Sequence, residues 1–144
     1  MELNDFRYED IHVGQLFEFE RFISNDDVLK FAELSGDYNP LHVDESYAKK
    51  TMFNGSIVHG MLAASLFSTL VGMVCPGKRN LYLSQSVEFK KPIYPNSSLK
   101  VIGKVKSKID SFKLVVMGTE IVHNGSIMIS GEAKVKMLDD YNEK

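Results

Sequence analysis

Residues 57–75 read IVHGMLAASLFSTLVGMVC, an uncharged stretch of 19 residues that is followed by Pro76-Gly77. Apolar residues occupy most of its helical circumference, which predicts a helix over about Val58–Val74 that is buried on several sides. At 1.5 Å per residue, this helix would be about 25 Å long. The stretch is long enough to span a membrane, but its histidine, glycines and hydroxyl side chains make insertion unfavourable. We therefore expect the buried helix of a globular domain.

The chain after this helix changes from a helical to a strand period. Apolar side chains alternate with polar or charged ones in four segments, which begin near Leu81, Val101, Phe112 and Ile127. Turn residues separate the segments, and Asn124-Gly125 is the dipeptide most typical of a type I′ hairpin. Short connections favour antiparallel neighbours, so we predict an antiparallel meander. A single α+β domain over residues 1–144 follows, in which an antiparallel sheet wraps around a long central helix.

The segment before the central helix predicts one strand and two shorter helices. Residues 8–23 alternate as an approach segment and first strand. Ser24 and Asp27 stand in capping-box spacing, and Gly36 is a natural helix stop. A second helix is predicted over Glu45–Lys50.

Charge is spread unevenly along the chain. The net charge of −2 and the pI of about 6.1 give no support to nucleic-acid binding. Residues 1–77 carry 12 acidic and 5 basic side chains, whereas residues 78–144 carry 7 acidic and 12 basic ones. The basic half suits a phosphorylated ligand, although solvated lysines on strand faces are the simpler explanation for most of this charge.

Cys75 is the only cysteine, which excludes an internal disulfide. Because it follows an apolar run, we expect a buried, inert thiol rather than a nucleophile. The first 15 residues have neither the basic start nor the apolar core of a secretory signal. We predict a cytoplasmic protein that binds neither nucleic acid nor membranes.

A polar motif, Gly36-Asp37-Tyr38-Asn39-Pro40-Leu41-His42, lies between the first helix and the central one. It sets a carboxylate and an imidazole five residues apart, where Pro40 disfavours helical backbone at Asn39. Gly60 follows with 17 residues between it and His42. An acid, a base and a backbone donor are a minimal set for proton transfer beside a carbonyl group.

Residues 31–44, FAELSGDYNPLHVD, together with Ala48, resemble the hydratase-2 motif of the MaoC-like dehydratases. The resemblance continues through residues 57–68, 76–78, 82–92 and 130–136 and so covers almost the whole chain. It points most closely to the single-domain (R)-specific enoyl-CoA hydratases of that family.

The resemblance implies a hot-dog fold and a homodimer in which the two sheets pair into one. It also implies reversible syn addition of water across the 2,3-double bond of a trans-2-enoyl thioester, which gives an (R)-3-hydroxyacyl product. No cofactor is implied beyond the coenzyme A that the acyl-CoA substrate carries.

The residue roles implied by the resemblance follow from matching positions. Asp37 and His42 match the catalytic pair that activates one water, and Gly60 matches the residue whose backbone N–H binds the thioester oxygen. Asn39 and Ser68 match supporting positions, Asn39 through local backbone bonds and Ser68 through a bond to the Asp37 carboxylate. Candidates for the floor of the acyl tunnel are Val71 and Val135. Candidates for the coenzyme A phosphates are Lys78, Arg79, Lys90 and Lys91.

Each of these residues also has an ordinary structural explanation. Asp37 after a glycine is a typical turn residue, and His42 taken alone is a partly buried histidine. Ser68 suits a bond to the Ala64 carbonyl within its own helix. His59 could serve as a ligand or a second base, but a structural role that supports the loop before the helix is the simpler explanation. The spacing of the histidines lacks the pattern of a helical zinc site, so we predict no metal. The joint pattern favours catalysis.

Three other functions fit the same residues. The nearest is a 3-hydroxyacyl-acyl-carrier-protein dehydratase of fatty-acid synthesis. The second is a non-catalytic module that binds acyl thioesters, which the complete set of Asp37, Asn39 and His42 disfavours. A thioesterase of the same fold is the third.

Overall fold

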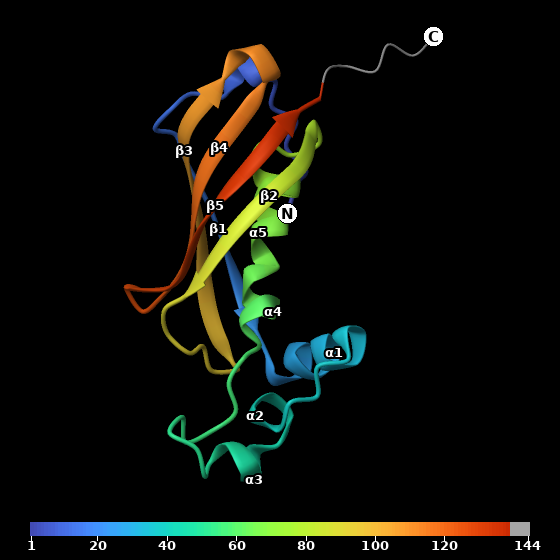
Figure 1. Ribbon diagram of the computed structural model, residues 1–144, viewed down its shortest axis with the longest axis vertical. Coiled ribbons are helices and arrows are strands. Elements are labelled where there is room, and N and C mark those ends of the chain that lie inside the picture. The colour runs from blue at the N-terminus through green and yellow to red at the C-terminus, as the bar shows by residue number, and fades with distance from the viewer. Residues whose placement is uncertain (139–144) are drawn as a thin grey trace.

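A five-stranded antiparallel sheet curves around one helix in the computed structural model, which describes residues 1–138 (Figure 1). The order across the sheet is β1-β3-β4-β5-β2. The strands are β1 (Leu16–Ile23), β2 (Asn80–Phe89), β3 (Ser97–Ile109), β4 (Leu114–His123) and β5 (Ser126–Met137). The predicted sheet around a central helix is confirmed.

The central helix consists of three consecutive pieces, which are α4 (Gly60–Ala64), α5 (Leu66–Thr69) and a π-helical turn at Leu70–Val74. It begins two residues later than predicted, because His59 has a non-helical ψ of 129° and the Val58 N–H donates to the Ile93 carbonyl at 2.7 Å. The chain turns away after Val74, as Pro76-Gly77 predicted. Among residues 1–138, no helix combines the length and apolar character needed to cross a membrane.

The apolar face of the sheet packs on the central helix in two clusters. One surrounds the first half of the helix and includes Phe67, Leu70, Leu99, Val101 and Ile129. The other surrounds its end and includes Val71, Cys75, Val105, Met117 and Val135. Burial in this cluster raises the pKa of the Cys75 thiol to about 12, so the thiol stays protonated, as an inert structural cysteine would.

Two parts of the predicted meander are wrong. β2 does not pair with β3, which follows it in the chain, but with β5 at the opposite side of the sheet. Phe112 is not in a strand; it belongs to a 3-10 turn and is 63% exposed. The hairpin at Asn124-Gly125 is as predicted, since both residues have positive φ.

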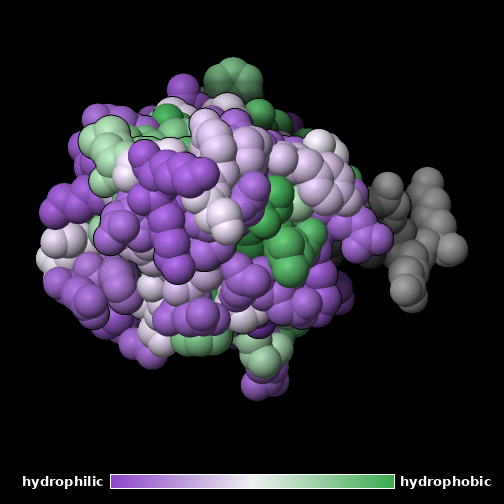
Figure 2. Space-filling model, turned by 90° about the horizontal axis from the view of Figure 1, so that it is seen from below, coloured by the Kyte–Doolittle hydropathy of each residue, from purple (hydrophilic) through white to green (hydrophobic). Residues whose placement is uncertain are grey.

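Three short helices lie beyond the N-terminal end of the central helix, at the bottom of Figure 1. They are α1 (Asn25–Ser35), α2 (Pro40–Val43) and α3 (Glu45–Ala48). The predicted capping box starts α1, because the Ser24 hydroxyl accepts from Asp27 N–H and the Asp27 carboxylate accepts from Ser24 N–H. Helix α3 ends two residues before the predicted Lys50. Figure 2 views this end and shows apolar side chains grouped among hydrophilic ones.

Candidate active site

Local hydrogen bonds shape the loop between α1 and α2. Gly36 ends α1 in the left-handed region, with φ of +80°, and its N–H donates to the Ala32 carbonyl. The Asp37 carboxylate then accepts from Asn39 N–H at 3.1 Å, and the Asn39 side chain accepts from Leu41 N–H at 3.0 Å. Asn39 is therefore the N-cap of α2, so the side chains of Asp37 and Asn39 themselves fix this turn.

His42 lies on α2, and its ring reaches residues 57–59, the segment just before the central helix. Its Nδ1 is 2.8 Å from the Ile57 carbonyl oxygen. Because a carbonyl only accepts, Nδ1 carries the proton of this bond, and Nε2 of the neutral ring keeps its lone pair. A backbone bond from Ile57 N–H to the Leu41 carbonyl, at 3.2 Å, holds the same two segments together. The ring therefore presents a base at Nε2.

His59 joins the two halves of the site. Its ring stacks on that of His42, with centroids 3.9 Å apart and planes 29° apart. Its Nε2 lies 2.9 Å from the backbone carbonyl oxygen of Asp37 and 3.9 Å from the Asp37 carboxylate. The sequence predicted a structural role for this residue but not its contact with both Asp37 and His42.

Gly60 begins the central helix next to this cluster. Its N–H lies in the first helical turn, where N–H groups lack an acceptor within the helix. The ring of Phe89 lies against the glycine so closely that an added Cβ would come within 2.6 Å of a ring carbon. A side chain at position 60 would therefore displace either the ring or the start of the helix.

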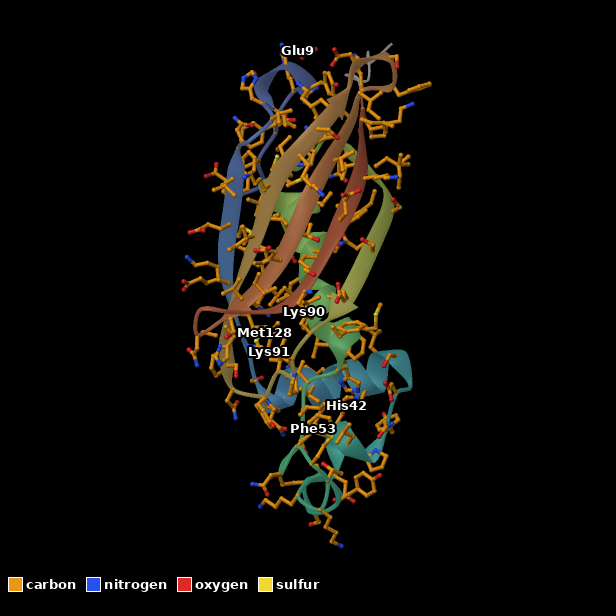
Figure 3. The ribbon with its side chains drawn as sticks, turned by 60° about the vertical axis from the view of Figure 1, so that its left-hand side comes forward. Glu9, His42, Phe53, Lys90, Lys91 and Met128 are labelled. Atoms are coloured by element: carbon orange, nitrogen blue, oxygen red, sulfur yellow. The ribbon has the colours of Figure 1, made fainter. Side chains whose placement is uncertain are left out.

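These four residues line one cavity of about 400 Å³. Asp37, His42, His59 and Gly60 line it together with an apolar wall, which includes Phe53, Ile57, Val58, Met61, Phe89, Ile93 and Ile129. Lys90, Lys91 and Pro92 complete the lining, and the backbone N–H groups of the two lysines donate to the Met128 carbonyl. Figure 3 shows His42 and Phe53 in the region of the short helices, and the two lysines with Met128 at the adjacent end of the sheet.

Phe53 is held at the cavity by bonds on both sides of its loop. The Tyr94 hydroxyl donates to the Phe53 carbonyl at 2.8 Å, and the Glu45 carboxylate accepts from Ser56 N–H at 2.9 Å. The hydrogen bond from the Ser56 N–H is the main cause of the lowered pKa of Glu45, and the positive charge of Lys49 lowers that pKa further. The loop is therefore fixed to the connection between β2 and β3 and to α3. Phe53 forms part of the cavity wall, which the sequence did not predict.

The remaining predicted residues lie away from this cavity. Ser68 is exposed, and among residues 1–138 no hydrogen bond joins its hydroxyl to Asp37 or to Ala64. Val71 and Val135 are fully buried in the second core cluster and do not line the cavity. Tyr82 packs against the same cluster, and burial raises its pKa to about 12.

Two of the four predicted phosphate ligands, Lys78 and Arg79, lie at the far end of the central helix from the cavity. Lys78 and Arg79 follow the last turn of the central helix, whereas the cavity lies at its first turn, and a helix over residues 60–74 separates the two by about 20 Å. Arg79 also donates to the Asp5 carboxylate. The other two predicted phosphate ligands, Lys90 and Lys91, line the cavity.

Asp37, His42 and His59 are close enough to suggest a metal site. One nitrogen or oxygen of each lies within 4.8 Å of the others, a proximity that the spacing of the histidines in the sequence did not reveal. However, lone pairs of imidazoles lie in the ring plane, and stacked rings direct them side by side rather than to one point. Both rings also bond to backbone carbonyls. This geometry favours acid–base chemistry over metal binding.

The chain is similar to known proteins along most of its length. The family model described as a MaoC like domain matches residues 10–126. An (R)-specific enoyl-CoA hydratase of Aeromonas caviae is 38% identical over 130 residues, which cover 90% of this chain and 97% of that protein. A mitochondrial 3-hydroxyacyl-[acyl-carrier-protein] dehydratase of Arabidopsis thaliana is 33% identical and covers 85% of this chain and 75% of that protein.

Solved structures show the same fold. An R-hydratase of Pseudomonas aeruginosa, solved in the unliganded form, superposes with a TM-score of 0.90 at 34% identity and covers 96% of this chain and 89% of that one. The (R)-hydratase of Aeromonas caviae superposes with a TM-score of 0.87. The hot-dog fold implied by the sequence is confirmed.

Proposed function

Because the chain belongs to the MaoC-like dehydratase family and is a hydro-lyase of that kind, we propose that it is an (R)-specific enoyl-CoA hydratase. It adds water reversibly and syn to a trans-2-enoyl-CoA and forms an (R)-3-hydroxyacyl-CoA. The observation that carries this proposal is the convergence of Asp37, His42 and Gly60 on one largely apolar cavity.

In the proposed reaction, Asp37 and His42 hold one water between them. The water oxygen bonds to C3 as the pair accepts one of the water protons, and the pair delivers a proton to C2, so that it returns to its starting protonation state. The two act as a coupled unit on a single water, so the proton transfers belong to the pair. Positioned acid–base groups of this kind contribute on the order of 10²–10⁴ in rate.

The Gly60 N–H is the proposed donor to the thioester oxygen, where enolate-like charge develops as C3 is attacked. The N-terminal turn of the helix adds a favourable dipole for that charge. A single such donor is worth roughly 3 kcal/mol in the transition state.

Replacing Gly60 with Ala should lower kcat about 10²-fold, because the new Cβ collides with the Phe89 ring and shifts the oxyanion donor. Steady-state kinetics on crotonyl-CoA measures this loss. Gly72→Ala is the matched control in the same helix, since an added Cβ there has nothing within 4 Å. Wild-type turnover in Gly60→Ala would contradict the predicted displacement of the donor and would mean that the Phe89 ring, which is 52% exposed, moves aside instead.

The purified protein should convert crotonyl-CoA to (R)-3-hydroxybutyryl-CoA, followed as loss of the conjugated thioester absorbance with chiral analysis of the product. Release of free thiol would instead indicate a thioesterase, and tight binding without water addition would indicate a non-catalytic module.

Coenzyme A is the proposed carrier, and its phosphates meet Lys90 and Lys91. These lysines line the cavity, although each also has a protein partner, since Lys90 lies 3.3 Å from Glu88 and Lys91 donates to the Ser126 hydroxyl. The second candidate is a 3-hydroxyacyl-acyl-carrier-protein dehydratase, which the Arabidopsis relative favours. Rates on matched CoA and carrier-protein thioesters separate the two.

We also propose a cytoplasmic homodimer in which the whole chain, residues 1–144, forms one domain. The free edge of β2 supports the dimer, because Leu81 and Leu83 on that strand are 52% and 50% exposed. An unpaired strand edge with apolar side chains is suited to pairing with a second sheet.

A further inference from the structure

His59 has the most constrained environment of the polar residues at the cavity. Its side chain is 2% exposed and contacts two rings, that of Phe31 at a centroid distance of 4.9 Å and that of His42 at 3.9 Å. The aromatic pair fixes the plane of the His59 ring, and stacking then restricts the plane of His42. The orientation of the His42 Nε2 lone pair therefore depends on His59.

Hydrogen bonding determines which tautomer His59 adopts. Nε2 lies 2.9 Å from the Asp37 carbonyl oxygen, and since that oxygen only accepts, Nε2 carries the proton. The opposite ring nitrogen, Nδ1, is buried and makes no hydrogen bond with any residue that the structure describes. An unprotonated Nδ1 is the less costly state there, because a buried N–H without an acceptor loses its bond to water.

The backbone of His59 connects this ring to the oxyanion donor. Its carbonyl accepts the first helical bond of α4 from Ala63 N–H at 3.2 Å, and the next residue in the chain is Gly60. One residue thus contacts the backbone of Asp37, the ring of His42 and the start of the helix that presents the Gly60 N–H.

We propose that His59 is a positioning residue that holds the Asp37–His42 pair in register with the Gly60 N–H, through its Nε2–H tautomer and its stacked ring. This inference rests on the proposed hydratase function. It assigns no proton transfer to His59, because its Nδ1 is buried and its Nε2 is committed to a backbone carbonyl. Loss of this alignment should lower kcat, the rate at which bound substrate reacts, rather than weaken substrate binding.

Two substitutions separate the ring from its hydrogen bond. His59→Phe keeps an aromatic ring beside His42 but removes the donor to Asp37, and we expect kcat on crotonyl-CoA to fall about 100-fold with KM nearly unchanged, as a displacement of about 1 Å would cause. His59→Gln keeps an N–H directed to that carbonyl and should recover part of the loss.

His123→Phe is the matched control, because the His123 ring also bonds to a backbone carbonyl, that of Ser98 at 2.9 Å, but lies outside the cavity. It should retain wild-type kcat and KM. Wild-type kcat in His59→Phe would overturn the proposal. So would a kcat of His59→Gln no higher than that of His59→Phe, or an equal loss in His123→Phe.

Ring-nitrogen NMR of the wild-type protein at alkaline pH tests the inference without relying on turnover or on the folding of a variant. We expect the proton of His59 on Nε2 and that of His42 on Nδ1. A proton on Nδ1 of His59 would overturn the positioning role. An inactive wild-type protein with the expected tautomers would defeat the hydratase proposal alone.

Discussion

Replacing Asp37 with Asn should lower kcat for crotonyl-CoA hydration about 10³-fold, within the range that positioned acid–base groups contribute. The variant keeps the size of the side chain and removes only its charge and its capacity to exchange a proton. The predicted loss therefore appears in kcat measured by steady-state kinetics, and the thermal unfolding midpoint should stay close to that of the wild type.

The structure explains why this substitution is mild for the fold. The amide oxygen of Asn can still accept from Asn39 N–H, as the Asp37 carboxylate does at 3.1 Å. The bonds made by the Asp37 backbone, to the Ser35 hydroxyl and to His59, do not depend on the side chain. Unfolding of the variant would contradict this account.

Asp44→Asn is a matched control for Asp37→Asn. Asp44 is also an exposed turn residue, and its carboxylate accepts from Tyr47 N–H at 3.0 Å, but it does not line the cavity. We expect wild-type turnover in this variant. A similar loss in both variants would show that the loop geometry, rather than the chemistry of Asp37, limits the rate.

Local signals predicted the elements that local interactions determine. The capping box at Ser24 and Asp27, the stop at Gly36 and the hairpin at Asn124-Gly125 depend on residues within four positions of one another, so the sequence alone contains the information. The central helix was predicted for a related reason, since an uncharged run of that length has few alternatives in a globular protein.

Long-range pairing was not predicted, because neighbouring segments in the chain need not be neighbours in the sheet. The connection from β2 to β3 is short, yet β2 lies beside β5 and β3 lies beside β1 and β4. The same limit affected the proposed ligand contacts. Lys78 precedes β2 and Lys90 follows it, so the two lysines lie at opposite ends of the same strand. Only the fold shows that the cavity lies at the end near Lys90.

The proposed catalytic pair could be identified from sequence, whereas its contact with His59 could not. Asp37 and His42 belong to one short motif, and Gly60 matched by position. The stacking of His59 on His42 depends on the fold, which returns the chain to the start of the central helix beside α2. The only sequence signal for this contact was the place of His59 next to Gly60.

Replacing His42 with Ala should also lower kcat about 10³-fold, because the variant lacks the Nε2 lone pair that faces the proposed water. Steady-state kinetics on crotonyl-CoA measures the loss, and His123→Ala is the control for removing a histidine outside the cavity. Added imidazole should restore part of the rate, since the deletion leaves a space against the His59 ring. Turnover close to wild type would exclude His42 from the reaction.

The double variant Asp37→Asn/His42→Ala tests whether the two residues act on one water. Groups that act as a unit lose most of their effect when either is removed, so the second substitution should cost less than about tenfold beyond the first. If the two residues contributed independently, the two losses would multiply, and kcat of the double variant would fall about 10⁶-fold. One side-chain nitrogen or oxygen of each residue lies within 4.8 Å of the other, which is close enough to share a single water molecule. A multiplicative loss would mean that each residue acts at a separate step.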